Sequence, residues 1–170
     1  MYIRILGAIL IVISCAGVGY YLVFNHKREE KAISQLIGAL DYMQCELTYR
    51  LTPLPELCRM TAAENIGMVS QVMLALADAM DSQISPDVSA CMHAALIKSP
   101  KLPTRTHALM QKLGGSLGKF DMEGQLRGLE NVRQLCRKEM ESLSNHRDQR
   151  LKNYQTLSIC AGVALAILLI

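Results

Sequence analysis

The segment YRLTPLPEL, Tyr49–Leu57, places two prolines with one residue between them in a chain that otherwise favours helix. A proline disfavours the α conformation in the residue before it, which predicts extended backbone at Thr52 and Leu54. Pro55 suits the first position of a helix, because it lacks only a backbone N–H that would be unpaired there. Glu56 would then lie at the positive end of the helix dipole. The segment predicts a stiff corner that ends one helix and begins the next.

The composition of the chain favours a helical protein that does not bind nucleic acid. Of the 170 residues, 51% are hydrophobic and 5% are aromatic, and the chain has ten Met and no Trp. The alternation of Val, Ile and Thr that is typical of strands is scarce, so the profile is all-α. The formal net charge of +3 is small, and no basic stretch is interleaved with aromatic residues. We therefore expect no nucleic-acid partner.

Apolar residues recur at helical spacing in segments separated by Gly, Pro and Asn. The first of these stripes comprises Ile33, Leu36, Ile37, Leu40, Met43 and Leu47. We expect helices over residues 26–50, 55–64 and 68–81, from Ser85-Pro86-Asp87 to about 98 with Pro86 in the first turn, over 104–117, and from the N-cap Asp121 onward. Short connections make successive helices antiparallel, so the prediction is one antiparallel six-helix bundle.

Both ends of the chain are apolar enough to cross a membrane. Ile5–Phe24 contains 20 uncharged residues, about 30 Å as a helix, which matches the thickness of a bilayer core. Residues 154–170 are also uncharged, which predicts transmembrane helices at 5–24 and 154–170 around a domain at 26–153. Basic residues flank the domain side of both segments, against Arg4 alone on the far side, and this asymmetry places the domain in the cytosol. They are Lys27, Arg28, Lys31, Arg147, Arg150 and Lys152.

A different interpretation of the N-terminus stays open. The stretch VISC, Val12–Cys15, resembles the motif at which a signal peptidase cuts before a cysteine that then carries lipid. Lipoproteins usually continue with a polar tether, whereas the nine residues AGVGYYLVF that follow Cys15 are apolar or weakly polar. This continuation favours a helix that is retained.

The antiparallel order places the corner at the same end of the bundle as two later turns. If the first helix leaves the membrane near His26, Arg50 is about 36 Å away along it. The turns at 82–87 and 117–121 then lie at this distal end. We expect the distal rim to bind a partner protein, although helix capping alone would also explain its residues. They are Thr52, Leu54, Pro55, Glu56, Gly118, Asp121 and Gln125.

The turns near Asn65 and at 99–103 return to the membrane in this arrangement. Lys98, Lys101 and Arg105 would join the basic residues beside the apolar segments and form a face against anionic lipid headgroups. Ordinary charge bias around membrane segments and solvated helix faces would give the same pattern. Both interpretations therefore stay open.

The sequence contains no motif for catalysis or for binding a metal or cofactor. KLGGSLGK, Lys112–Lys119, is Gly-rich but lacks the spacing of a phosphate-binding loop. The four histidines form no H-x-x-x-H or H-E-x-x-H pair. The six cysteines are scattered singly, which predicts reduced, buried thiols and neither disulfides nor a zinc site. Asp121 and Glu123 are better explained as a cap and a first-turn acid than as paired catalytic carboxylates. We expect a protein without enzymatic activity and without a cofactor.

Two blocks and a terminal pattern carry a family resemblance. The blocks are ELTYRLTPLPEL, Glu46–Leu57, and LGGSLGKFDMEGQ, Leu113–Gln125, and a long helix then runs into the final apolar segment. In the order and spacing of these features the chain resembles the stage III sporulation protein AB family. The resemblance implies a cytosolic six-helix bundle similar to the domains of the inner-membrane platform protein of type II secretion.

The resemblance also implies a role in the secretion-like channel between mother cell and forespore, from the mother-cell side of the outer forespore membrane. The implied partners are a secretion-type ATPase similar to stage III sporulation protein AA and other stage III sporulation membrane proteins. Two alternatives stay open: a membrane-anchored receptor or regulator for a small ligand, and a platform of a pilus or secretion system outside sporulation. Self-association of the bundle stays open as well.

Overall fold

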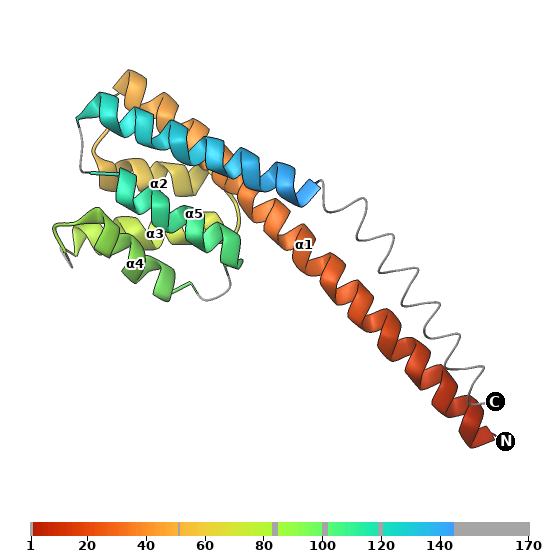
Figure 1. The fold of residues 1–170 in the computed structure, drawn as a ribbon. Coiled ribbons are helices and arrows are strands. Elements are labelled where there is room, and N and C mark those ends of the chain that lie inside the picture. The colour runs from red at the N-terminus through yellow and green to blue at the C-terminus, as the bar shows by residue number, and fades with distance from the viewer. Residues whose placement is uncertain (1, 51, 83–84, 100–101, 119–120, 145–170) are drawn as a thin grey trace. The chain divides into compact units, whose positions relative to one another are not determined.

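A computed structural model describes residues 2–50, 52–82, 85–99, 102–118 and 121–144, with side chains from Phe24 onward. Within these ranges the chain forms helices and no strands (Figure 1). The helices are α1 Tyr2–Arg50, α2 Leu54–Glu64, α3 Met68–Asp81, α4 Val88–Ile97, α5 Thr104–Ser116 and a sixth helix over residues 122–144. For these residues, the prediction of an all-α fold with six helices in the bundle is confirmed.

The chain divides into two compact units. One comprises Met1–Arg28 and Glu141–Ile170, and the other, called the bundle below, comprises Glu29–Met140. The predicted transmembrane segments and the motif at Cys15 involve residues or side chains outside the described part, so they stay predictions. Among the helices that the structure describes, none combines the length and the apolar character needed to cross a membrane.

Helices that follow one another in sequence pack against one another in the bundle. α2 packs on α3, α3 on α4, and α4 on α5. The short links make each pair antiparallel, as predicted. α1 and the sixth helix lie side by side (Figure 1), and Arg133 of the sixth helix forms an ion pair with Asp41 of α1 at 2.8 Å. These two long helices therefore join the beginning of the bundle to its end.

The apolar stripes predicted from helical spacing form the core. Every helix of the bundle contributes fully buried side chains, and burying each large one stabilises the fold by about 1.5–3 kcal/mol relative to exposure. They include Ile33, Leu36, Leu40, Met43, Leu57, Met73, Leu76, Met92, Met110, Leu113 and Leu129. Six of these side chains lie on α2, α3, α4 and α5, helices of 14 residues or fewer, so the core depends on several short elements at once.

The start of α2 differs from the prediction. Leu54 is the first helical residue and is not extended, so Pro55 lies one position inside the first turn. The carbonyl of Pro53 accepts a hydrogen bond from the Leu57 N–H at 2.9 Å and closes this turn. First-turn N–H groups have no partner within the helix, so the missing N–H of Pro55 leaves no bond unmade. Glu56 lies in the first turn, as predicted.

The start of α4 also differs. The helix begins at Val88, so Pro86 precedes it and does not occupy its first turn. Asp87 is the N-cap: its carboxylate accepts a hydrogen bond from the Ser89 N–H at 3.1 Å, and its carbonyl accepts one from the Cys91 N–H at 3.2 Å. The Asp87 carboxylate gives a first-turn N–H an acceptor, which the side chain of Pro86 could not do. This cap fixes the start of the helix at Val88.

Of the four cysteines whose side chains the structure describes, three are buried as predicted and one is not. Cys58, Cys91 and Cys136 are buried free thiols, whereas Cys45 is exposed on α1. Burial raises the pKa of the Cys58 thiol to about 12, although Arg59 acts in the opposite direction. Burial likewise raises the pKa of Cys136 to about 11. These two thiols therefore stay protonated and unreactive at neutral pH.

The shifted thiols predict a loss of stability at high pH. A thiol in the unfolded chain has a pKa of 9.0, whereas folded Cys58 keeps its proton up to about 12. The unfolded state therefore releases the proton first, and the free energy of unfolding should fall as the pH rises above 9. The free energy of unfolding, measured by urea titration of the full chain from about pH 8 to about pH 11, should depend less on pH in Cys58→Ala than in the unchanged chain. Cys45→Ala is the control and should keep the pH dependence of the unchanged chain; equal slopes for both variants would contradict the assignment.

Candidate docking surface

The three turns that the sequence places at the distal end of the bundle meet in the structure. A Cβ atom at Gly118, in the turn after α5, would lie 3.8 Å from Cδ2 of Leu54 at the start of α2. The same atom would lie 2.5 Å from Cγ2 of Val88 at the start of α4. Gly118 has a φ of +74°, which side chains rarely adopt. Glycine is therefore needed twice here, for the backbone conformation and for the close approach of the three turns.

Capping explains part of the predicted rim. The Asp121 carboxylate accepts a hydrogen bond from the Gly124 N–H at 3.0 Å, and its carbonyl accepts one from the Gln125 N–H at 2.9 Å. Asp121 therefore caps the sixth helix, as predicted, and its side chain is nevertheless exposed. Glu56 is also exposed and lies 3.8 Å from Arg59. Capping and availability to a partner are compatible at both acids.

The remaining rim residues line the same end. Thr52, Pro55 and Gln125 are half-buried, and Gly118 is exposed. Leu54 is half-buried beside Gly118. The structure thus brings the start of α2 and the turn before the sixth helix together, which are the two blocks that carry the family resemblance.

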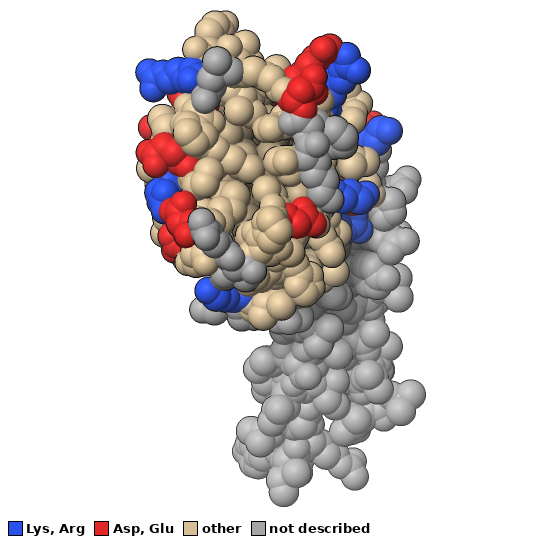
Figure 2. Space-filling model, turned by 90° about the vertical axis from the view of Figure 1, so that its left-hand side faces the viewer, with Lys and Arg blue, Asp and Glu red and all other residues tan. Residues whose placement is uncertain are grey.

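Figure 2 looks onto this end of the bundle. Among the described residues in this view, most charged side chains lie toward the periphery, and few lie near the middle. Arg59 of α2 forms ion pairs with Glu56 and with Asp81 of α3, and Arg127 of the sixth helix forms one with Glu123. An uncharged centre within a charged surround is typical of surfaces that bind proteins.

An aromatic side chain stands at the same end. Tyr49, in the last turn of α1, is 81% exposed. Tyrosine is enriched among the residues that contribute most to protein–protein binding, because it buries a large area and keeps a polar hydroxyl. Tyr49 was not among the predicted rim residues, because spacing alone does not show whether a helical Tyr faces the core.

A hollow of about 460 Å³ lies at the junction of α3 and α4. It is lined by Met80, Ser85, Pro86, Val88 and Cys91. The Cys91 thiol donates to the Ser85 carbonyl at 3.4 Å, which occupies one of the polar groups of the lining. Val88 belongs both to this hollow and to the contact with Gly118. The sequence could not reveal the hollow, because it depends on how two separate helices approach each other.

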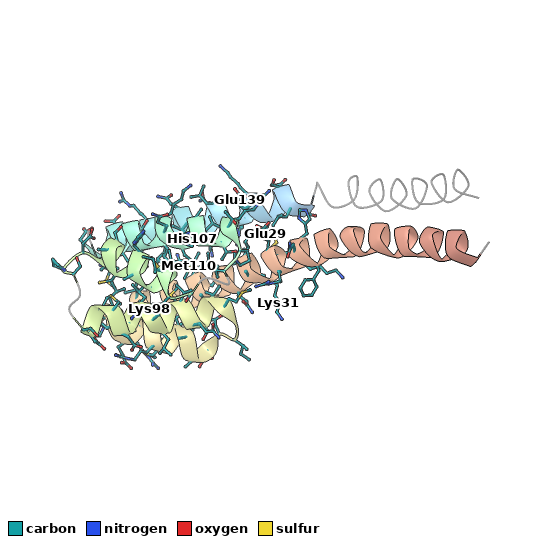
Figure 3. The ribbon with its side chains drawn as sticks, turned by 90° about the horizontal axis from the view of Figure 1, so that it is seen from below. Glu29, Lys31, Lys98, His107, Met110 and Glu139 are labelled. Atoms are coloured by element: carbon teal, nitrogen blue, oxygen red, sulfur yellow. The ribbon has the colours of Figure 1, made fainter. Side chains whose placement is uncertain are left out.

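The residues predicted to face the membrane surface have different surroundings. Lys27, Arg28, Lys31 and Lys98 are exposed. Arg105 is half-buried and forms ion pairs with Glu29 of α1 at 3.5 Å and with Glu139 of the sixth helix at 2.7 Å. Figure 3 labels both glutamates, which lie on different helices. Arg105 therefore ties three helices together, a structural role that the prediction missed.

Four members of the predicted basic face lie outside the described residues: Lys101, Arg147, Arg150 and Lys152. Within the described part of the chain, no group of three or more His, Cys, Asp or Glu side chains could hold a metal ion. The two ends of the bundle thus remain as candidate sites, one with an uncharged centre and the other with exposed lysines.

Comparisons with known proteins agree on one family. The family model described as stage III sporulation protein AB matches residues 4–170. A solved structure described as stage III sporulation protein AB (SpoIIIAB) has a TM-score of 0.63 and 20% sequence identity, and the similarity covers 72% of this chain and 98% of that one. The solved structure shows that the fold is shared. The comparison with curated proteins gives no match.

Proposed function

The chain belongs to the stage III sporulation protein AB family, and from this we propose that it is a membrane-attached platform whose distal end docks another component of the sporulation channel. The protein has a role in sporulation, as its family does. The platform role is non-enzymatic: the bundle would hold a partner at the membrane and would carry out no chemistry. The proposed location is the outer forespore membrane on the mother-cell side, with the bundle in the cytosol.

One observation carries the docking proposal. Leu54, Val88 and Gly118 come from three separate turns and meet at one end of the bundle, where the surface is largely uncharged in its middle. Pro53, directly before α2, and Pro55, in its first turn, restrict the backbone there. A surface that is rigid before binding loses less entropy when a partner docks. This arrangement favours protein binding over simple capping, since a cap alone needs no shared contact between turns.

The proposed partner is a secretion-type ATPase, with another stage III sporulation membrane protein as the alternative. This choice comes from the family resemblance, and the geometry supports only a protein partner of some kind. A small-ligand receptor finds less support: the hollow beside Val88 is lined by no charged residue, and its thiol already donates to a backbone carbonyl. A ligand site would be expected to present several convergent polar groups.

Crosslinking in sporulating cells tests the docking proposal. A photoreactive phenylalanine analogue in place of Tyr49, which is 81% exposed at the distal end, should crosslink the full chain to the ATPase or to another channel component. The control is the same analogue in place of Leu74, which is 48% exposed on α3. We expect a specific product from position 49 and none from position 74. The same products from both positions, or none from position 49, would remove the distal end as the docking surface.

A further inference from the structure

Two large aliphatic side chains are exposed at turns on the other end of the bundle. Ile66, between α2 and α3, is 87% exposed, and Ile97, the last residue of α4, is 68% exposed. An exposed aliphatic residue is ordinary when it is isolated. Two of them at one end, near basic residues, need an explanation.

The packing of the helices places both isoleucines at the same end. α3 begins directly after Ile66-Gly67, α4 ends at Ile97, and these two helices pack against each other in antiparallel order. The start of α3 and the end of α4 therefore lie together. The amide of Gln35 on α1 also reaches the Ile66 carbonyl, at 2.5 Å. We call this the proximal end, because it lies near the point where α1 enters the bundle.

The exposure of Ile66 is a consequence of a tightly held turn. Besides the bond from Gln35, the Asn65 amide donates to the Thr61 carbonyl at 2.8 Å. Gly67 has a φ of +118°, a conformation available to glycine and rarely to other residues. The backbone on both sides of Ile66 is therefore fixed, and its side chain is held outward.

The end of α4 has the same character for a different reason. α4, VSACMHAALI, contains no charged residue, and His93 and Ser89 are its only strongly polar side chains. Cys91, Met92, Ala95 and Leu96 are buried. Ile97 continues this apolar helix beyond the part that the bundle covers, and the exposed Lys98 follows it directly.

Two exposed lysines near the proximal end are the groups there that an anionic surface would attract. Lys98, directly after α4, and Lys31, on α1, are both exposed. Arg105 is paired with two acids, Glu29 and Glu139, so this group of three carries one net negative charge and offers no free cation to lipid. Glu64 is an exposed acid near Ile66 and opposes the two lysines.

Chain continuity adds an independent argument. Phe24 ends the 20-residue uncharged stretch Ile5–Phe24 and is 54% exposed. Only four residues separate it from Glu29, the first residue of the bundle, within the continuous helix α1. A membrane that holds the uncharged stretch is therefore only a few residues, along the chain, from the first residue of the bundle.

We propose that the proximal end rests on an anionic lipid surface, with Ile66 and Ile97 inserted among the headgroups and Lys98 and Lys31 paired with lipid phosphates. Aliphatic side chains beside lysines are the combination by which proteins bind the membrane interface. The proposal relies on membrane attachment through Ile5–Phe24 and is independent of docking at the distal end. It differs from the basic face predicted by sequence, because aliphatic residues provide part of the contact and Arg105 provides none.

The absence of Trp from the chain allows a direct test. Single variants Ile66→Trp and Ile97→Trp of the full chain are reconstituted in vesicles of phosphatidylglycerol and phosphatidylcholine with brominated acyl chains, which quench nearby Trp fluorescence. Phe24→Trp is the positive control for membrane attachment. Tyr49→Trp places an exposed Trp at the distal end, and it is the matched control for quenching of a Trp that is not inserted in the membrane. We expect several-fold more quenching at positions 66 and 97 than at position 49.

Each other result overturns a specific part of the proposal. If Trp at position 24 is quenched but Trp at positions 66 and 97 is quenched no more than at position 49, the protein is attached to the membrane and the two isoleucines are not inserted. A blue-shifted emission without quenching would mean that a protein or a second copy of the chain covers the proximal end. No quenching at position 24 would remove the attachment and the proposal together. Equal quenching in vesicles of phosphatidylcholine alone would remove the preference for anionic lipid.

Discussion

Spores should fail to form when Leu54→Ala and Glu56→Lys are combined in the chromosomal copy of this protein, although the bundle stays folded. Leu54 touches the position where the distal turns meet, and Glu56 is exposed at the same surface with only a 3.8 Å contact to Arg59. A few central residues usually carry most of the binding energy of a protein interface. Loss of an apolar contact and reversal of a charge should therefore reduce heat-resistant spores by orders of magnitude.

Folding must be measured beside the spore count. Leu54 is half-buried, so its truncation should lower the free energy of unfolding by about 1–2 kcal/mol, less than a fully buried leucine would. The matched control is Leu74→Ala with Glu64→Lys, which makes the same two chemical changes at exposed positions away from the distal end. The control strain should sporulate normally. Normal sporulation of the Leu54 and Glu56 variant would show that the corner only joins two helices.

Opposite changes in stability are expected from two adjacent glycines of α5. A Cβ at Gly114 would lie 2.5 Å from Cβ and 2.7 Å from Cγ of Met92, which is fully buried and has no room to retreat. A Cβ at Gly115 would meet nothing within 4 Å. Gly114→Ala should therefore push α5 away from α4 and lower the free energy of unfolding by about 1–3 kcal/mol. Gly115→Ala should raise it by about 0.5–1 kcal/mol, because alanine favours helix more than glycine does.

Thermal unfolding of the two full-length variants, followed by circular dichroism, checks the signs. For a domain of this size, a change of about 1 kcal/mol moves the midpoint by about 2–8 °C, so the two variants should lie clearly on opposite sides of the unchanged chain. If Gly114→Ala is also stabilised, α4 and α5 are farther apart than the structure shows. The pair is its own control, since both substitutions change the same residue type on the same helix.

The sequence was sufficient for the features that depend on neighbouring residues. Ile33, Leu36 and Leu40 repeat at helical spacing and are all buried, and Asp121 caps the helix that it was predicted to cap. The proline corner gave the break before α2, within one residue. Each of these features is set by local geometry, which spacing and side-chain chemistry describe directly.

Features that join distant parts of the chain were missed. Arg105 was predicted to face a membrane, but Glu29 and Glu139, its partners, lie 76 and 34 residues away in sequence, and nothing at position 105 identifies them. The two glycines at 114 and 115 are equivalent as letters, and only the position of Met92 separates them. Ile66 was part of a predicted break, and its exposure depends on the bond from Gln35 to the turn. Tertiary contacts decide each of these cases.

The ion pair between Asp41 and Arg133 has a consequence for how the protein is made. Its two residues are 92 positions apart, so at about 5–20 residues per second a ribosome needs about 5–20 s to add the second after the first. α2, α3, α4 and α5 can pair with their sequence neighbours during that time, but the side of α1 that the sixth helix covers stays open. A chaperone or the membrane surface would be the natural protection for this side of α1 during synthesis, and a truncated chain that ends before residue 122 would expose it permanently.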